Sequence, residues 1–127
     1  MGSELPVLSS AIHVPRPQPV HGRLAFTELR RSKRRVFLKP LRVQFLPAPK
    51  AEEARRVAFA VPRNVGTAVE RNRLRRRLRV VVAEATGSVP AGSYLVGIDK
   101  GFRELRFQEL RARVMDAMQR ASEASGR

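Results

Sequence analysis

The chain has 127 residues, of which 43% are hydrophobic, and its 26 Lys and Arg against 11 Asp and Glu give a formal charge of +15. This length suits one folded domain and is too short for two. The lack of cysteine excludes disulfides and thiolate metal sites and agrees with a cytoplasmic protein. The N-terminus lacks the pattern of a secretory signal, and no apolar run approaches the ~20 residues of a membrane-spanning helix. The charge favours a polyanionic partner, first a nucleic acid and second an anionic membrane.

The first half of the chain predicts a tail followed by one helix and three strands. Four prolines and little apolar periodicity predict a flexible Pro-rich tail over residues 1–21. Helical and alternating apolar patterns follow in turn, and the third strand is nearly all apolar, as in the centre of a sheet. The expected elements are a helix over 26–33 and strands over 34–38, 41–46 and 56–61.

The second half predicts two amphipathic helices around a fourth strand. Thr67 and Glu70 have the spacing of a capping box, which marks a helix start. One apolar stripe then recurs at helical spacing, through Leu74, Leu78, Val81, Val82 and Ala85. The later elements are a strand over 94–98, a helix over 107–121 and a flexible tail over 122–127. The folded domain is therefore expected at residues 22–121.

The basic residues concentrate at the start of the long central helix. From Arg63 to Arg79 there are seven arginines and one acid, a net charge of +6. The apolar stripe turns Asn72, Arg76 and Arg79 away from the core. Like-charged i,i+4 pairs cost about 0.2–0.5 kcal/mol each, so the isolated chain gains nothing from them. A solvated face usually mixes both signs, and this segment therefore predicts a nucleic-acid surface.

The same segment carries a family resemblance. The stretch RNVGTAVERNRLRRRLR, residues 63–79, closely resembles the signature of the bacterial ribonuclease P protein subunit, in which a glycine precedes an Arg-Asn-Arg motif and further basic residues at helical spacing. The likeness covers about residues 23–121. It implies an α+β fold, a single αβββαβα domain. This would be a two-layer sandwich like domain 2 of ribosomal protein S5, with a left-handed βαβ crossover.

The resemblance also implies a function. Members of this family join a catalytic RNA that removes the 5′ leader of precursor tRNA by Mg²⁺-dependent endonucleolytic hydrolysis, in tRNA 5′-end maturation. Catalysis belongs to the RNA, so no catalytic residue and no metal site are expected in the protein, and Mg²⁺ is held mainly by the RNA and substrate. The implied partners are the ribonuclease P RNA and precursor tRNA, with no membrane and no obligate protein partner. The implied RNA-binding residues are Arg63, Asn64, Arg71, Asn72, Arg73, Arg75, Arg76 and Arg79.

A cleft between the first helix and the sheet is implied to hold the leader, at Phe26, Arg30 and Gln44. Phe26 matches the first aromatic of that cleft, but a core residue that anchors the helix is an equal alternative. Arg30 and Gln44 stand where many members carry aromatics. Leader binding is therefore expected to depend more on charge and hydrogen bonds than on stacking.

Other functions would explain the high positive charge of the chain but not its Arg-Asn-Arg motif. The main alternative is a structural RNA-binding protein of ribosomal type with no processing role. A DNA-binding module lacks support, because no helix-turn-helix pattern or dimer seam is visible. Membrane binding would need the apolar stripe that the core uses. A nuclease acting alone would need converging carboxylates or a histidine pair, and the acids here are scattered.

Overall fold

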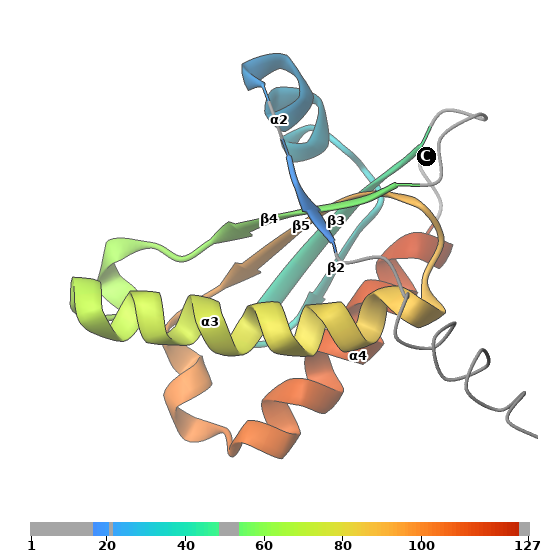
Figure 1. Ribbon diagram of the computed structural model, residues 1–127. Helices are drawn as coiled ribbons and strands as arrows, with labels where there is room; N and C mark the ends of the chain where they lie inside the picture. The colour runs from blue at the N-terminus through green and yellow to red at the C-terminus, as the bar shows by residue number, and fades with distance from the viewer. Residues whose placement is uncertain (1–16, 21, 49–53, 125–127) are drawn as a thin grey trace, which may run out of the picture.

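The computed structural model describes residues 17–20, 22–48 and 54–124 (Figure 1). Within these ranges the helices are α2 (Arg23–Arg30), α3 (Ala68–Ala85) and α4 (Phe107–Glu123). The strands are β1 (Gln18–Pro19), β2 (Arg35–Leu38), β3 (Leu41–Pro47), β4 (Arg55–Ala60) and β5 (Gly92–Ile98). Short 3₁₀ turns are η1 (Arg63–Val65), η2 (Thr86–Ser88) and η3 (Lys100–Glu104). The α+β class and the expected αβββαβα order are confirmed, with β1 and the turns added.

The strands form one mixed sheet in the order β1-β4-β5-β3-β2. β1 and β5 both run parallel to β4, whereas β3 is antiparallel to β5 and β2. α3 connects the parallel neighbours β4 and β5 and so makes the expected βαβ unit. The handedness of this crossover stays a prediction.

The hydrophobic core lies between the sheet and the helices α3 and α4. Alternation along β3 turns Leu41, Val43 and Phe45 into this core, and each is 2% exposed or less. Phe45 packs on Tyr94 of β5 with ring centroids 4.8 Å apart. The Tyr94 hydroxyl donates to the Pro90 carbonyl at 2.6 Å, and burial raises the pKa of this phenol. Figure 1 shows α3 and α4 on one side of the sheet and α2 on the other.

Several predicted boundaries are wrong. The first helix, predicted over residues 26–33, lies at Arg23–Arg30 instead. Gln18 and Pro19, predicted to belong to the tail, pair in parallel with Arg56 and Val57 at the edge of the sheet. At the other end, α4 continues to Glu123, two residues into the predicted C-terminal tail. The rest of the N-terminal tail, residues 1–16 and 21, lies outside the described residues, as do residues 125–127.

The start of α3 follows the predicted capping box. The Thr67 hydroxyl accepts from the Glu70 amide at 3.1 Å, and the Thr67 amide donates to Glu70 Oε1 at 2.8 Å. These bonds satisfy two of the amide groups that a helix start leaves unpaired. None of the helices in the described ranges is long and apolar enough to cross a membrane.

Candidate nucleic-acid interface

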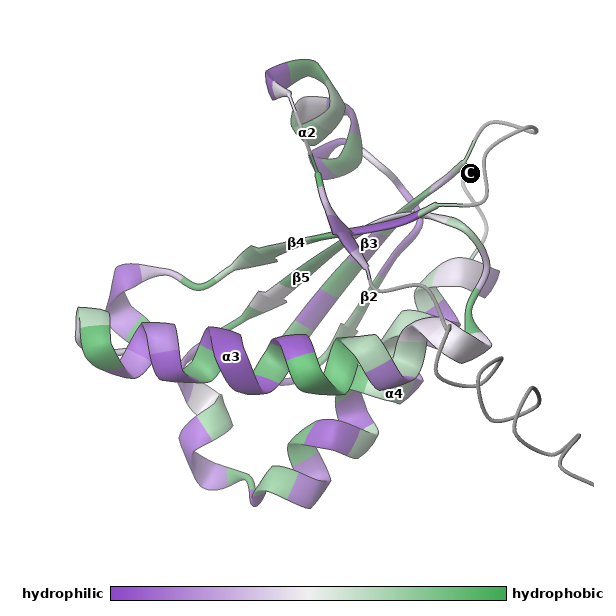
Figure 2. Ribbon diagram, viewed as in Figure 1, coloured by the Kyte–Doolittle hydropathy of each residue, from purple (hydrophilic) through white to green (hydrophobic). Residues whose placement is uncertain are grey.

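α3 presents its arginines to solvent because its apolar stripe is fully used by the core. Leu74, Leu78 and Val81 are at most 3% exposed, and Figure 2 shows hydrophilic and hydrophobic residues alternating along the helix. Six predicted RNA-binding residues are exposed, and we call them the basic face: Arg63, Asn64, Asn72, Arg73, Arg76 and Arg79. The other two, Arg71 and Arg75, are half-buried.

The residues of the Arg-Asn-Arg motif differ in their contacts. Arg71 Nε donates to the carbonyl of Gly66 at 3.3 Å, so this arginine also holds the turn before the helix. Asn72 Oδ1 accepts from Arg75 Nη1 at 2.8 Å. The Arg73 side chain has no hydrogen bond or ion pair with any other residue that the structure describes. The motif therefore combines one structural arginine with one that is fully available to a ligand.

The single acid of the basic segment, Glu70, pairs with Arg103 rather than with an arginine of α3. Glu70 Oε1 lies 3.4 Å from Arg103 Nη2, which also donates to the Val65 carbonyl at 2.8 Å. The Thr67 amide and Arg103 lower the pKa of Glu70 below its usual value. A Cβ on Gly66 would lie 2.7 Å from Glu70 Oε1 and 2.8 Å from Arg103 Nη2, so glycine leaves room for this ion pair. Sequence reasoning missed Arg103, because only the fold brings it to the turn.

The basic residues of α3 border two separate hollows. Arg75 and Arg79 border one of about 490 Å³ beside β1. Arg73 and Arg77 border another of about 350 Å³ beside the start of α4, which we call the α4 notch. Arg77 is exposed and was not among the predicted RNA-binding residues, although its i+4 spacing from Arg73 places both on one side of the helix.

The three residues predicted for the leader cleft differ in exposure: Arg30 is exposed, Phe26 is half-buried and Gln44 is buried. Phe26 is half-buried and lies outside the main core cluster, with the Arg30 guanidinium 6.0 Å from its ring centre. Leu29, which is fully buried, anchors α2 instead. The choice between a cleft residue and a core residue therefore stays open for Phe26, and Arg30 is exposed beside it.

Gln44 has a different role from the predicted one. It is 4% exposed, and its Nε2 donates to the carbonyls of Arg30 at 2.7 Å and Ser32 at 3.3 Å. The Ser32 hydroxyl in turn donates to the Phe45 carbonyl. Gln44 therefore anchors the end of α2 to the sheet, and its amide group is occupied within the protein.

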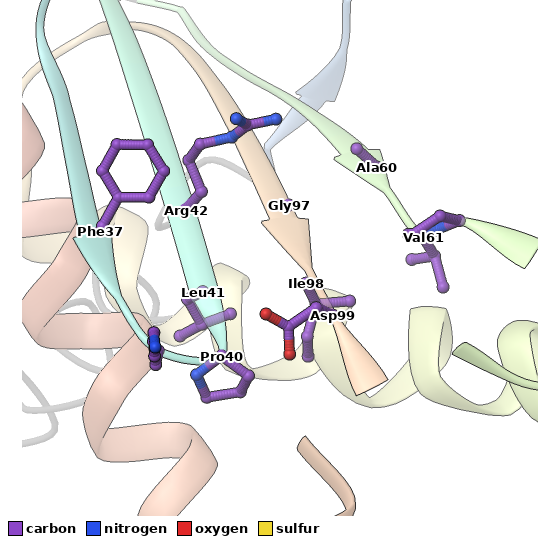
Figure 3. Close-up of a pocket in the computed structure, with 11 residues that line it drawn as sticks. Phe37, Pro40, Leu41, Arg42, Ala60, Val61, Gly97, Ile98 and Asp99 are labelled. Carbon is purple, nitrogen blue, oxygen red and sulfur yellow. The ribbon is translucent and has the colours of Figure 1, made fainter. Parts of the chain in front are cut away.

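A hollow of about 750 Å³ lies on the side of the sheet that carries α2, and we call it the sheet groove (Figure 3). Its walls come from the β2–β3 turn and the last residues of β4 and β5. Phe37 and Arg42 pair across β2 and β3, and the Arg42 guanidinium lies 5.6 Å from the ring centre. Phe37 is 65% exposed. Sequence reasoning missed this aromatic, although alternation with Val36 and Leu38 could have placed it on the open side.

The described residues contain no group of three His, Cys, Asp or Glu that could hold a metal ion. Asp99, the acid in the sheet groove, accepts from the Gly101 amide at 2.7 Å. This surface can therefore bind anions and stack on planar groups, whereas it offers no converging carboxylates for metal chemistry.

A scan against protein-family models matches residues 14–122 to the ribonuclease P family. The chain belongs to the ribonuclease P protein family. The matched range includes the whole basic face and the sheet groove. The resemblance of residues 63–79 to the family signature is thus supported by a match over most of the chain.

Curated members of the ribonuclease P family give consistent matches. The ribonuclease P protein component of Mycoplasma pneumoniae is 33% identical over 102 residues, which cover 80% of this chain and 85% of that protein. The component of Thermobifida fusca is 50% identical over 48 residues, 38% of this chain and 33% of that protein. The component of Roseiflexus is 37% identical over 76 residues, 58% of this chain and 62% of that protein. The latter two matches span less than two thirds of the relative.

Solved ribonuclease P proteins share the fold. The protein from Thermotoga maritima superposes with a TM-score of 0.70 at 22% identity, covering 81% of this chain and 96% of that one. The protein from Staphylococcus aureus gives a TM-score of 0.65 at 15% identity, with 88% and 95% covered. At these identities the likeness establishes the ribonuclease P protein fold alone.

Proposed function

We propose that this chain is the protein subunit of a cytoplasmic ribonuclease P that removes the 5′ leader of precursor tRNA. The basic face binds the catalytic RNA, and the sheet groove, together with α2 on the same side of the sheet, binds the single-stranded leader. Family membership and the names of the relatives support the assignment to ribonuclease P. The observation that carries the RNA contact is the set of exposed arginines on α3 whose one neighbouring acid is paired with Arg103.

The electrostatics of α3 suit an RNA backbone. Each cation that neutralises a phosphate releases condensed counterions, so unpaired arginines gain most from binding. The guanidinium groups sit on an 18-residue helix whose opposite side is buried in the core. The backbone that carries these side chains is therefore fixed before binding, so docking of RNA has to order the arginine side chains but not the helix.

The groove suits an unpaired strand rather than a duplex. Phe37 offers a ring on which a base of any sequence can stack, and Lys39 and Arg42 supply positive charge in the same hollow. Stacking is therefore available from β2 as well, although the resemblance led us to expect leader binding to depend more on charge and hydrogen bonds, at Arg30 and Gln44, than on stacking.

Mg²⁺ belongs to the RNA and its substrate in this proposal. The described residues offer no carboxylate cluster that fits the ion, so no step is assigned to a metal on the protein. The chain's contribution is to bind both RNAs and to offset the repulsion between their phosphates where they meet.

Reconstitution tests the proposal. The full chain is added to a bacterial ribonuclease P RNA and a precursor tRNA with a 5′ leader, at a Mg²⁺ concentration too low for the RNA alone. We expect cleavage at the leader junction to be restored. An equally basic ribosomal protein is the control and should not restore cleavage. RNA binding without restored cleavage would favour the alternative of a structural RNA-binding protein.

A further inference from the structure

The α4 notch contains an aromatic ring that the fold leaves open. Phe107 is the first residue of α4, an amphipathic helix that packs its apolar side on the core. Phe107 itself does not reach the core, because it is 43% exposed and lines the notch, whereas Leu110, in the next turn, is 4% exposed and belongs to the core. An exposed phenylalanine next to arginines gains little in the free protein.

The two arginines on the α3 side of the notch lack partners. Arg73 and Arg77 are both exposed and line the notch four residues apart. Neither side chain forms an ion pair or hydrogen bond within the part of the chain that the structure describes. Their mutual repulsion on one side of a helix is unfavourable, and a bound anion would offset it.

The far wall of the notch is held in place. The Arg103 guanidinium is bound to the Val65 carbonyl at 2.8 Å and lies 5.6 Å from the ring centre of Phe102. Glu70 also lines the notch but is paired with Arg103. The notch therefore combines a fixed wall, an open ring and two free guanidinium groups within about 350 Å³, the low end of the size range of small-ligand sites.

We propose that the α4 notch binds one unpaired nucleotide of the catalytic RNA, with the base on Phe107 and a flanking phosphate on Arg73 and Arg77. This inference rests on the proposed function, because it takes the RNA as the partner of α3. A nucleotide carries a flat π-face next to an anion, which matches the ring and the guanidinium pair together. An acidic peptide would satisfy the arginines but leave the ring without a planar partner.

Binding measurements on the full chain separate the two parts of this site. In Phe107→Leu, which keeps an apolar side chain, we expect the affinity for ribonuclease P RNA to fall about 5- to 100-fold, as for loss of one stacked base. The slope of log affinity against log salt should not change. In Arg73→Gln/Arg77→Gln the affinity should also fall, and the slope should decrease by about 2. Gln119→Leu, in the last turns of α4, is the matched control and should bind like wild type.

Photocrosslinking locates the contact directly. With Phe107 replaced by p-benzoylphenylalanine, irradiation of the complex should attach α4 to one unpaired segment of the catalytic RNA. The same group at Gln119 should give no such product. Circular dichroism shows whether each variant folds, and the crosslink does not depend on the Leu variant.

The outcomes distinguish this inference from the proposed function. If wild-type protein fails to bind ribonuclease P RNA or to restore cleavage, the proposed function is wrong and the inference falls with it. If wild type does both while folded Phe107→Leu binds equally well and position 107 gives no crosslink, only the notch inference is wrong. Crosslinking to a duplex region would also overturn it.

Discussion

The arginines of the basic face and those of the sheet side have different neighbours. On α3, Arg73 and Arg76 lie free on a helix that is fixed by its buried side. On the sheet side, Arg42 lies over Phe37 and Arg30 over Phe26, each within about 6 Å of a ring centre. The arginines of α3 therefore form a surface of unpaired positive charge. Those of the sheet side form a surface in which cations and aromatic rings are mixed. This difference suggests that one region reads phosphate backbone and the other holds unpaired bases.

The largest expected effect on RNA affinity comes from removing positive charge from the basic face. In Arg73→Gln/Arg76→Gln we expect the affinity for ribonuclease P RNA to fall on the order of 10- to 100-fold, because two charge-assisted contacts are lost. Filter binding at several salt concentrations measures both the affinity and the salt slope, which should decrease by about 2.

The matched control removes two charges elsewhere. Arg113→Gln/Arg120→Gln takes both from α4, outside the basic face, and should bind far more like wild type. Equal losses in the two double variants would mean that net charge alone determines affinity. The contrast between the two regions would then have no functional meaning.

A smaller effect is expected on the sheet side. Phe37→Leu should lower the affinity for precursor tRNA by about fivefold, the low end of the stacking range, because leucine keeps the apolar contact. Affinity for leaderless tRNA and for ribonuclease P RNA should stay unchanged. Fluorescence titrations with both tRNA forms measure this, and an equal loss for the leaderless form would remove Phe37 from the leader site.

The anchor of α2 gives a third test. Gln44→Leu should lower the free energy of unfolding by about 1 kcal/mol, because the Arg30 and Ser32 carbonyls lose their donor. Urea unfolding measures the loss, with the exposed Gln119→Leu as control. Leader binding should weaken as α2 loosens, while binding of ribonuclease P RNA stays constant. Unchanged stability would show that the buried amide is not the anchor.

The smallest effect concerns pH and the turn before α3. The Thr67 amide and Arg103 lower the pKa of Glu70 from its usual 4.5, so the ionised form stabilises the fold above that pH and the contribution is lost as the pH falls through the lowered value. Wild type should therefore be more stable than Glu70→Gln at pH 7, and the difference should shrink below about pH 4.5. Thermal unfolding from pH 7 to pH 3 measures this.

Glu28→Gln, on the exposed side of α2, controls for the loss of one negative charge. A Glu70→Gln variant as stable as wild type at pH 7 would mean that the ion pair with Arg103 contributes nothing to the turn. RNA affinity per folded molecule should change little in either variant, since Glu70 is already paired with Arg103 rather than with an arginine of the basic face.

Local patterns determined what the sequence could predict. The stripe from Leu74 to Ala85 and the capping box at Thr67 depend on residues within a few turns, so they gave α3 and its exposed arginines correctly. The burial of a residue in the first turn of a helix is harder to predict from the sequence. Phe107 and Leu110 are both apolar, but only Leu110 reaches the core. Arg103, Gln44 and β1 make their contacts across the fold, and periodicity contains no information about such pairings.

The two-residue strand β1 has a consequence for how the protein behaves at high concentration. It occupies the outer edge of β4 and contains Pro19, which has no amide hydrogen to offer a further strand. At the opposite edge, β2 is four residues long and flanked by Arg34 and Lys39. Within the described residues, neither edge strand offers a long row of free backbone amides, so pairing of a second copy with an edge of this sheet is disfavoured.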